Sequence, residues 1–154
     1  MRKKIYSEAE VRLIFLRSEH QPSPVSGQPG HSGALHNTLS NRELDSRNLA
    51  SGKNPTAFVE GLRVQVEVAT KLLNSPAGQA VLGELDAAGP GHRRTITEDV
   101  SPAVAIRYGM GQGIGMTRVL PAQALPGTRV RMIVDSTVDS IHIQSIHPLL
   151  PGQY

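Results

Sequence analysis

The sequence predicts an α+β fold: N-terminal helices packed on an antiparallel β-sheet, with a central cleft between the two halves. Three observations predict it. Before Gly91 the apolar residues recur at helical spacing behind serine caps, and after Gly91 they form short runs separated by glycine, proline and aspartate. Because the helical segments precede the strands instead of alternating with them, an antiparallel sheet is favoured over a doubly wound parallel one. A chain of 154 residues is also long enough to bury a sizeable core.

The first helix is predicted from a capping box at Ser7–Glu10 and runs through Leu16. From about Glu19 the composition changes to glutamine, serine, proline and glycine, and the prolines favour extended backbone. We therefore interpret residues 1–28 as an N-terminal helix and linker, followed by the functional domain at 29–154. The alternative is that this helix packs on the domain as an extra layer.

Three further helical segments follow. Ser40–Glu43 is a second capping box. The segment from Thr56 to Leu73 has the pattern of the longest helix, because its apolar residues are spaced by four, four, three and four. Ser75, with a proline directly after it, is the expected N-cap of a last helix that ends at Gly89.

Five strands are expected in the second half, at residues 94–97, 104–108, 116–120, 128–135 and 141–146. In the last, strict alternation would put Ile141, Ile143, Ser145 and His147 on one face. His142 and Gln144 would then point the other way, and Pro148 would end the strand. The shared face begins apolar and ends with a hydroxyl and an imidazole, as expected where a strand leaves the core and enters a cleft.

Composition excludes several classes of function. The chain has no cysteine, which rules out disulfides, thiolate nucleophiles and cysteine-based zinc sites. Six histidines against three tyrosines, two phenylalanines and no tryptophan favour imidazole chemistry over nucleic-acid binding by aromatic stacking. The formal net charge of +3 favours an anionic partner only weakly. No apolar run approaches the ~20 residues that span a bilayer.

Two other patterns do not indicate a ligand site. Glycine occupies every second position from Gly109 to Gly115, which fits neither the dinucleotide-binding nor the Walker spacing, so a flexible hairpin connection is expected. His142 and His147 are five residues apart, so alternation in a regular strand would put them on opposite faces, and no carboxylate lies beside them. We therefore predict no metal and no cofactor.

His36 and Arg47 are the strongest early pair. Eleven residues are about three helical turns, so both would lie on one face of a helix, but about 16 Å apart along its axis. A helix restart at Ser40 would allow the two side chains to meet. Ordinary exposed polar residues would have the same spacing.

The segment Gly30-His31-x4-His36, with Ser40, Leu44 and Arg47 after it, resembles the opening motif of bacterial RNase A-like toxin domains. These domains form the C-termini of contact-dependent growth inhibition proteins. Thr56–Val59 resembles that family's Ser/Thr-x-Phe segment, and Ser145–Pro148 resembles its terminal Thr-Ala-Tyr-Pro. The resemblance covers about residues 30–149, in order. It departs from the family at two positions, with serine for threonine at 145 and histidine for tyrosine at 147.

The resemblance implies an RNase A-like fold without disulfides and a metal-independent endoribonuclease with catalytic residues His36, Arg47, Ser145 and His147. Such chemistry needs a base for the 2′-OH, a cation for the phosphorane and an acid for the leaving oxygen, which two histidines and an arginine supply. The two histidines would be base and acid in either order, with the arginine as phosphate clamp and the serine as a donor to a phosphate oxygen. His31, Arg129 and Arg131 are candidate substrate contacts, although a structural histidine and a solvated sheet face explain them equally well.

The resemblance also implies a biological setting. The domain would be secreted or delivered from the cell surface as part of a larger effector. It would cleave RNA in the cytoplasm of a target bacterium, and tRNA is one candidate substrate. An acidic immunity protein would neutralise it. Two rivals stay open. One is an ADP-ribosyltransferase-like toxin, although the late strands contain no Glu-x-Glu. The other is a non-catalytic module that binds RNA or protein.

Overall fold

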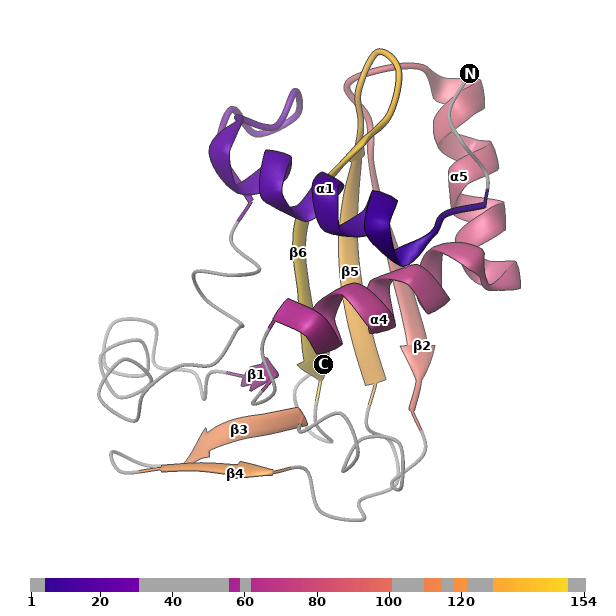
Figure 1. Cartoon of the computed structure of the whole chain (residues 1–154). Helices are drawn as coiled ribbons and strands as arrows, with labels where there is room; N and C mark the ends of the chain where they lie inside the picture. The colour runs from indigo at the N-terminus through magenta and orange to yellow at the C-terminus, as the bar shows by residue number, and fades with distance from the viewer. Residues whose placement is uncertain are drawn as a thin grey trace.

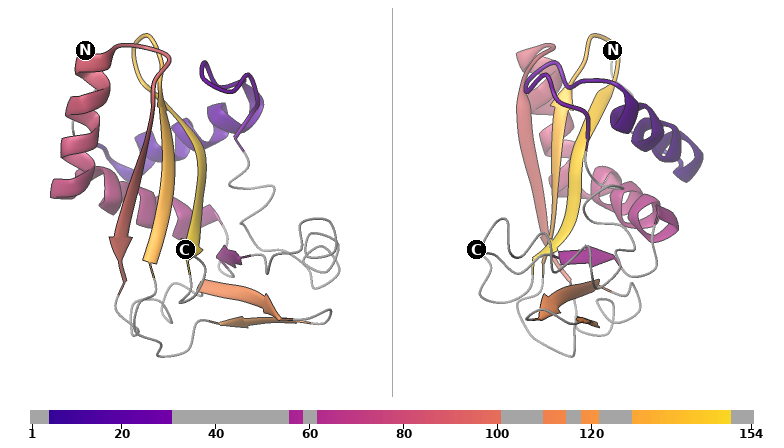
Figure 2. Two further views of the ribbon diagram at one scale, coloured as in Figure 1. Left: turned by 180° about the vertical axis from the view of Figure 1, so that it is seen from behind. Right: turned by 90° about the vertical axis from the view of Figure 1, so that its left-hand side faces the viewer.

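The structure, a computed structural model, describes residues 5–30, 56–58, 62–100, 110–114, 118–121 and 129–149. It confirms the α+β class. A three-stranded antiparallel sheet has the order β2-β5-β6, and helices α1 and α4 cross one of its faces while α5 packs beside β2 (Figures 1 and 2). A smaller antiparallel sheet has the order β1-β3-β4. The bounds are α1 Glu8–His20, β1 Thr56–Phe58, α4 Leu62–Asn74, α5 Pro76–Ala88, β2 Arg93–Asp99, β3 Met110–Ile114, β4 Arg118–Pro121, β5 Arg129–Ser136 and β6 Ile141–Leu149.

The helix starts follow the predicted caps. At α1 the side chain of Ser7 accepts a hydrogen bond from the backbone N–H of Glu10, whose own side chain accepts one from the backbone N–H of Ser7. At α5 the side chain of Ser75 accepts from the backbone N–H of Gly78, and Gly89 caps the other end with a positive φ of 87°. Local sequence therefore determines both starts.

The first helix is part of the core and not an appendage. Val11, Ile14 and Phe15 are buried in the same cluster as α4, α5 and the large sheet, and α1 contacts both α4 and β6. The structure thus has the second of the two arrangements that the sequence left open, with α1 as an extra layer. Apolar burial explains it, because a helix with three large buried side chains gains several kcal/mol, about 1.5–3 for each, by docking.

Two predicted elements are wrong in part. Residues 56–58 form β1, paired antiparallel with β3, and the helix begins only at Leu62. The run of alternating glycines is not a connection, because Gly111 and Gly113 lie within β3, between β1 and β4. In both cases strand pairing between distant segments prevails over a local pattern.

Every second residue of β5 points to the core side of the large sheet. Val130, Met132 and Val134 are buried, and Arg129, Arg131 and Ile133, which alternate with them, point to the other face. β6 contributes Ile141, Ile143 and Ile146 to the core side. These isoleucines are not evenly spaced by two, so the strand cannot alternate regularly.

A β-bulge in β6 is the cause, and it corrects the predicted faces of this strand. Val134 pairs with Ile143 and Ile133 pairs with Ser145, so Gln144 is an extra residue. Ser145 and His147 share a face as predicted, but it is the face opposite Ile141 and Ile143. β6 also continues one residue past Pro148, to Leu149, so the proline does not end it.

Several predicted features lie outside the described residues: the second capping box at Ser40–Glu43, the strand at 104–108, and His31, His36 and Arg47. Within the described ranges, no helix is long and apolar enough to cross a membrane.

Candidate functional site

Four of the predicted site residues lie together on the face of the large sheet that points away from α1 and α4. Arg131 of β5 is directly opposite His147 of β6, Ser145 is two residues along β6, and Arg129 is two residues along β5. Directly opposed Cβ atoms in an antiparallel pair are about 4.5–5.5 Å apart, so the side chains of Arg131 and His147 leave the two strands side by side. We call these four residues the polar strip.

The polar strip is only partly accessible. The two arginines and His147 are half-buried, whereas Ser145 has no exposed surface. Neither Oγ of Ser145 nor Nε of Arg131 has a hydrogen-bond partner among the described residues. Buried donors of this kind are costly unless something accepts from them. The strip therefore presents two donors suited to an anion.

The neighbouring strand β2 extends this face. Thr97 is opposite Arg131, Thr95 is opposite Ile133, and Asp99 is opposite Arg129. Asp99 offsets part of the positive charge at the Arg129 end, so the cationic character of the face centres on Arg131. Sequence reasoning missed Thr97, although the alternation in β2 and β5 would have found it once their register was known.

An ion pair between a partly exposed arginine and a buried carboxylate lies farther along the same face. Arg93 donates from Nε to Oδ1 of Asp135 at 2.6 Å and from a terminal nitrogen to Oδ2 at 2.9 Å, and the carboxylate is fully buried. Ser23 also donates to Asp135. The hydrogen bond to Asp135 raises the pKa of Arg93 above its ordinary value, and the negative charge of the carboxylate raises it further, against the opposing effect of burial. The hydrogen bond from Ser23 to Asp135 joins the segment around Ser23 to the sheet.

His142 lies on the same face as Ser145 and His147, contrary to the prediction that it faces away, because the bulge changes the alternation. It is nevertheless packed and not positioned for chemistry. Its Nε2 is 3.1 Å from the carbonyl oxygens of both Ser18 and Gln21, which makes Nε2 a hydrogen-bond donor. Its Nδ1 is 3.9 Å from Oδ2 of Asp135.

Ser23, Asp135 and His142 are the residue types of a serine hydrolase triad, but their geometry does not make one. In a triad the serine donates to the histidine, whereas here Ser23 donates to the carboxylate and Nε2 of His142 donates to backbone. The cluster holds chain segments together.

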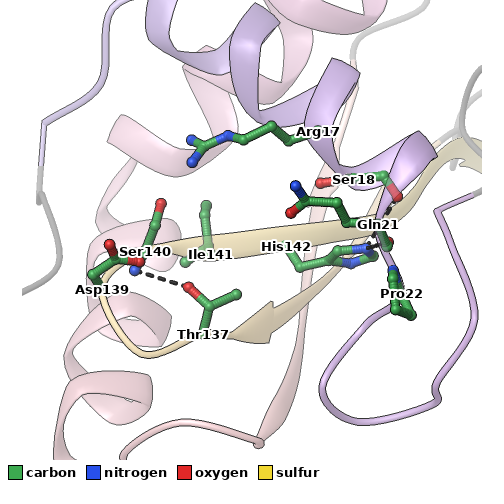
Figure 3. A pocket seen from close by; sticks show the side chains of 9 residues that line it. All are labelled: Arg17, Ser18, Gln21, Pro22, Thr137, Asp139, Ser140, Ile141 and His142. Carbon is green, nitrogen blue, oxygen red and sulfur yellow. Dashed lines mark hydrogen bonds between the residues drawn. The ribbon is translucent and has the colours of Figure 1, made fainter.

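A small pocket, about 140 Å³ in volume, lies between the end of α1 and the β5–β6 turn (Figure 3). Its lining includes Arg17, Gln21, Asp139 and His142, and no residue of the polar strip. It is therefore separate from the predicted site. Among the described residues, no group of three or more histidine, aspartate or glutamate side chains could hold a metal ion.

The structure thus brings Arg129, Arg131, Ser145 and His147 together, while His31, His36 and Arg47 lie outside the described residues. Comparisons of the chain with protein-family models, with curated proteins and with solved structures gave no match.

Proposed function

We propose that this protein is a metal-independent endoribonuclease toxin of the RNase A-like type. The observation that carries the proposal is the pairing of Arg131 with His147 across β5 and β6. Cleavage by the 2′-OH needs a cation beside a group that can exchange a proton near pH 7, and a guanidinium next to an imidazole meets this requirement.

The described residues take the following roles in the proposal. His147, half-buried at the edge strand, transfers a proton as acid or base. Arg131 stabilises the negative charge that develops on the phosphorane, and Arg129 contacts a neighbouring phosphate. Ser145 donates to a phosphate oxygen, in agreement with its buried Oγ that has no partner among the described residues.

His36 and Arg47 complete the proposed site on the strength of the sequence resemblance. One structural fact supports the inclusion of His36. Gly30 lies against β6, with the backbone N–H of Gly30 bonded to Ser18 O at 2.7 Å and no room for a side chain beside Ile143. His36 follows six residues later, and six residues span at most about 20 Å. The chain is therefore long enough to bring His36 to the polar strip.

The proposed substrate is cellular RNA, with tRNA as one candidate. The proposed partner is an acidic immunity protein that covers the polar strip or a surface beside it, by charge complementarity with a chain of formal net charge +3. The proposed setting is delivery as part of a larger effector into the cytoplasm of a target bacterium.

Incubation of the protein with total RNA in EDTA tests the proposal, with analysis of the product ends. We expect fragments with 2′,3′-cyclic phosphate ends, and no cleavage by either His36→Ala or His147→Ala. Consumption of NAD without cleavage would identify an ADP-ribosyltransferase instead. RNA retained but left intact would identify a binding module.

A further inference from the structure

The bulge at Gln144 decides which side chains of β6 reach the polar strip. Before it, Ile141 and Ile143 point into the core, and after it Ile146 does. With strict alternation from Ile143, Ser145 and His147 would point into the core and Ile146 would point out. The one extra residue therefore puts Ser145 and His147 on the face of Arg131.

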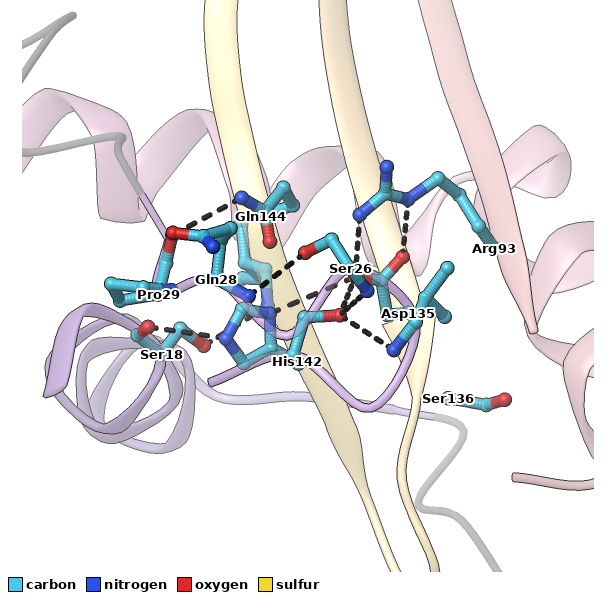
Figure 4. Close-up of polar contacts among 12 residues, drawn as sticks. Ser18, Ser26, Gln28, Pro29, Arg93, Asp135, Ser136, His142 and Gln144 are labelled. Atoms are coloured by element: carbon cyan, nitrogen blue, oxygen red, sulfur yellow. Dashed lines mark hydrogen bonds and ion pairs between the residues drawn. The ribbon is translucent and has the colours of Figure 1, made fainter. Parts of the chain in front are cut away.

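The bulge is held from outside the sheet by the end of α1 and the segment after it, residues 21–30, which we call the strap. The backbone N–H of Ile143 donates to Oγ of Ser18 at 3.0 Å. Nε2 of Gln144 donates to the carbonyl oxygen of Pro29 at 3.1 Å (Figure 4). With the bonds of His142 to Ser18 and Gln21, three consecutive residues at the bulge are bonded to α1 and the strap.

Gly30 makes this docking possible. A Cβ at Gly30 would lie 2.6 Å from the carbonyl oxygen of Ile143 and 3.2 Å from that of Ser18. Both are backbone atoms, so neither can move aside as a flexible side chain would. Only glycine allows the strap to approach β6 this closely.

We infer that the strap is a positioning element for the polar strip: by docking on Ile143 and Gln144 it fixes the bulge that puts Ser145 and His147 opposite β5. Gly30 of the strap and Ser18 of α1 are the positioning residues. The inference concerns geometry and stands by itself, whereas its consequence for RNA cleavage rests on the proposed function.

Engineered disulfides test the geometry without an activity assay. The chain has no cysteine, so introduced thiols have no competitors. Arg131→Cys/His147→Cys joins β5 to β6 beyond the bulge, and Arg131→Cys/Thr97→Cys joins β5 to β2, away from the strap. Directly opposed residues are about 4.5–5.5 Å apart at Cα, within the range that a disulfide spans. Both pairs should cross-link on oxidation.

Adding Gly30→Ala should lower the yield of the 131–147 cross-link several-fold and leave that of the 97–131 cross-link unchanged. Equal yields for both pairs, with and without Gly30→Ala, would overturn the inference. Loss of both cross-links would mean that Gly30→Ala unfolds the protein. In that case Ser18→Ala decides, because it removes the bond to Ile143 and adds no atom: selective loss of the 131–147 cross-link supports the inference and its retention overturns it.

Cleavage assays separate this inference from the proposed function. If the protein cleaves RNA, Gly30→Ala should reduce the rate at least tenfold, while Gly83→Ala, where a Cβ meets nothing within 4 Å, should leave it unchanged. If the unaltered protein cleaves no RNA, the proposed function fails, and the cross-linking result still decides the role of the strap.

Discussion

Arg131 and His147, sixteen positions apart in the sequence, lie directly opposite each other across β5 and β6, on the face of the sheet away from α1 and α4. The pairing joins a permanent cation to an imidazole, a group that can both donate and accept a proton. Ser145 lies next to this pair with a fully buried hydroxyl. The predictions below separate the parts of this arrangement that stabilise the fold from those proposed to act on RNA.

Ser145→Ala should reduce cleavage by about tenfold to a hundredfold, because it removes one donor to the phosphate. Stability should not fall, since Oγ of Ser145 has no partner among the described residues and loss of an unsatisfied buried hydroxyl costs little. Cleavage rates and urea unfolding of the same preparation test both expectations.

Ser136→Ala is the matched control. Ser136 is equally buried, but its hydroxyl bonds the carbonyl oxygen of Gly89 at 2.6 Å and accepts from the backbone N–H of His92 at 3.0 Å. We expect a loss of about 1–3 kcal/mol in unfolding free energy with unchanged cleavage per folded molecule. The opposite pattern, with Ser145→Ala unstable and fully active, would remove Ser145 from the site.

Arg93→Met should lower the unfolding free energy by about 2–3 kcal/mol, because it leaves the buried carboxylate of Asp135 without its cation. Arg94→Met should change it by less than about 0.5 kcal/mol, since Arg94 pairs with Glu84 at the surface, with side chains 40% and 59% exposed. Urea denaturation of the two variants side by side measures the difference. Equal losses of unfolding free energy in the two variants would mean that the Arg93–Asp135 pair stabilises the fold no more than a surface ion pair does.

Arg93→Lys should make stability fall at alkaline pH. A group whose pKa is raised by folding stabilises the folded state below its unfolded pKa and loses that effect as pH rises through its folded pKa. For Arg93 this pKa is raised above its ordinary value, so the guanidinium keeps its charge, and the pair persists, at the pH where a lysine loses its charge. A lysine titrates near 10.4. The gap in urea midpoint between the native protein and the variant should therefore stay constant up to about pH 10 and widen as the pH rises above about 10.4. A gap that stays constant up to about pH 11.5 would contradict the assignment.

Two glycines of α5 should respond in opposite directions to alanine. Gly83→Ala should stabilise by about 0.5–1 kcal/mol, because a Cβ there meets nothing within 4 Å and alanine is the better helix former. Gly78→Ala should destabilise by more than about 1 kcal/mol, because its Cβ would lie 1.9 Å from the carbonyl oxygen of Leu72. Thermal unfolding of both variants tests the packing of α5 on α4.

Local signals in the sequence were sufficient for the helix starts at Ser7 and Ser75, for the strand at 128–135 and for the α+β class. The caps at Ser7 and Ser75 act within a few residues, so they can be found without knowledge of the fold. Pairing between strands that are far apart in the sequence could not be predicted from such local signals. The strand at 56–58 depends on β3, more than fifty residues later.

The site shows the same division. Ser145 and His147 could be chosen as a pair because they are two residues apart in a strand. The face of the sheet on which they lie could not be predicted, because the bulge at Gln144 depends on Ser18 and Pro29, more than a hundred residues earlier. For the same reason Arg131 was predicted only as a general phosphate contact, and not as the partner of His147.

The most direct test of the proposed function is the rate of RNA cleavage in EDTA by the native chain, by His147→Ala and by His92→Ala. His92 is an exposed histidine between α5 and β2, where its ring bonds the carbonyl oxygen of Gly89. We predict at least a thousandfold loss for His147→Ala and no change for His92→Ala. Cleavage by His147→Ala at the native rate would contradict the proposed active site.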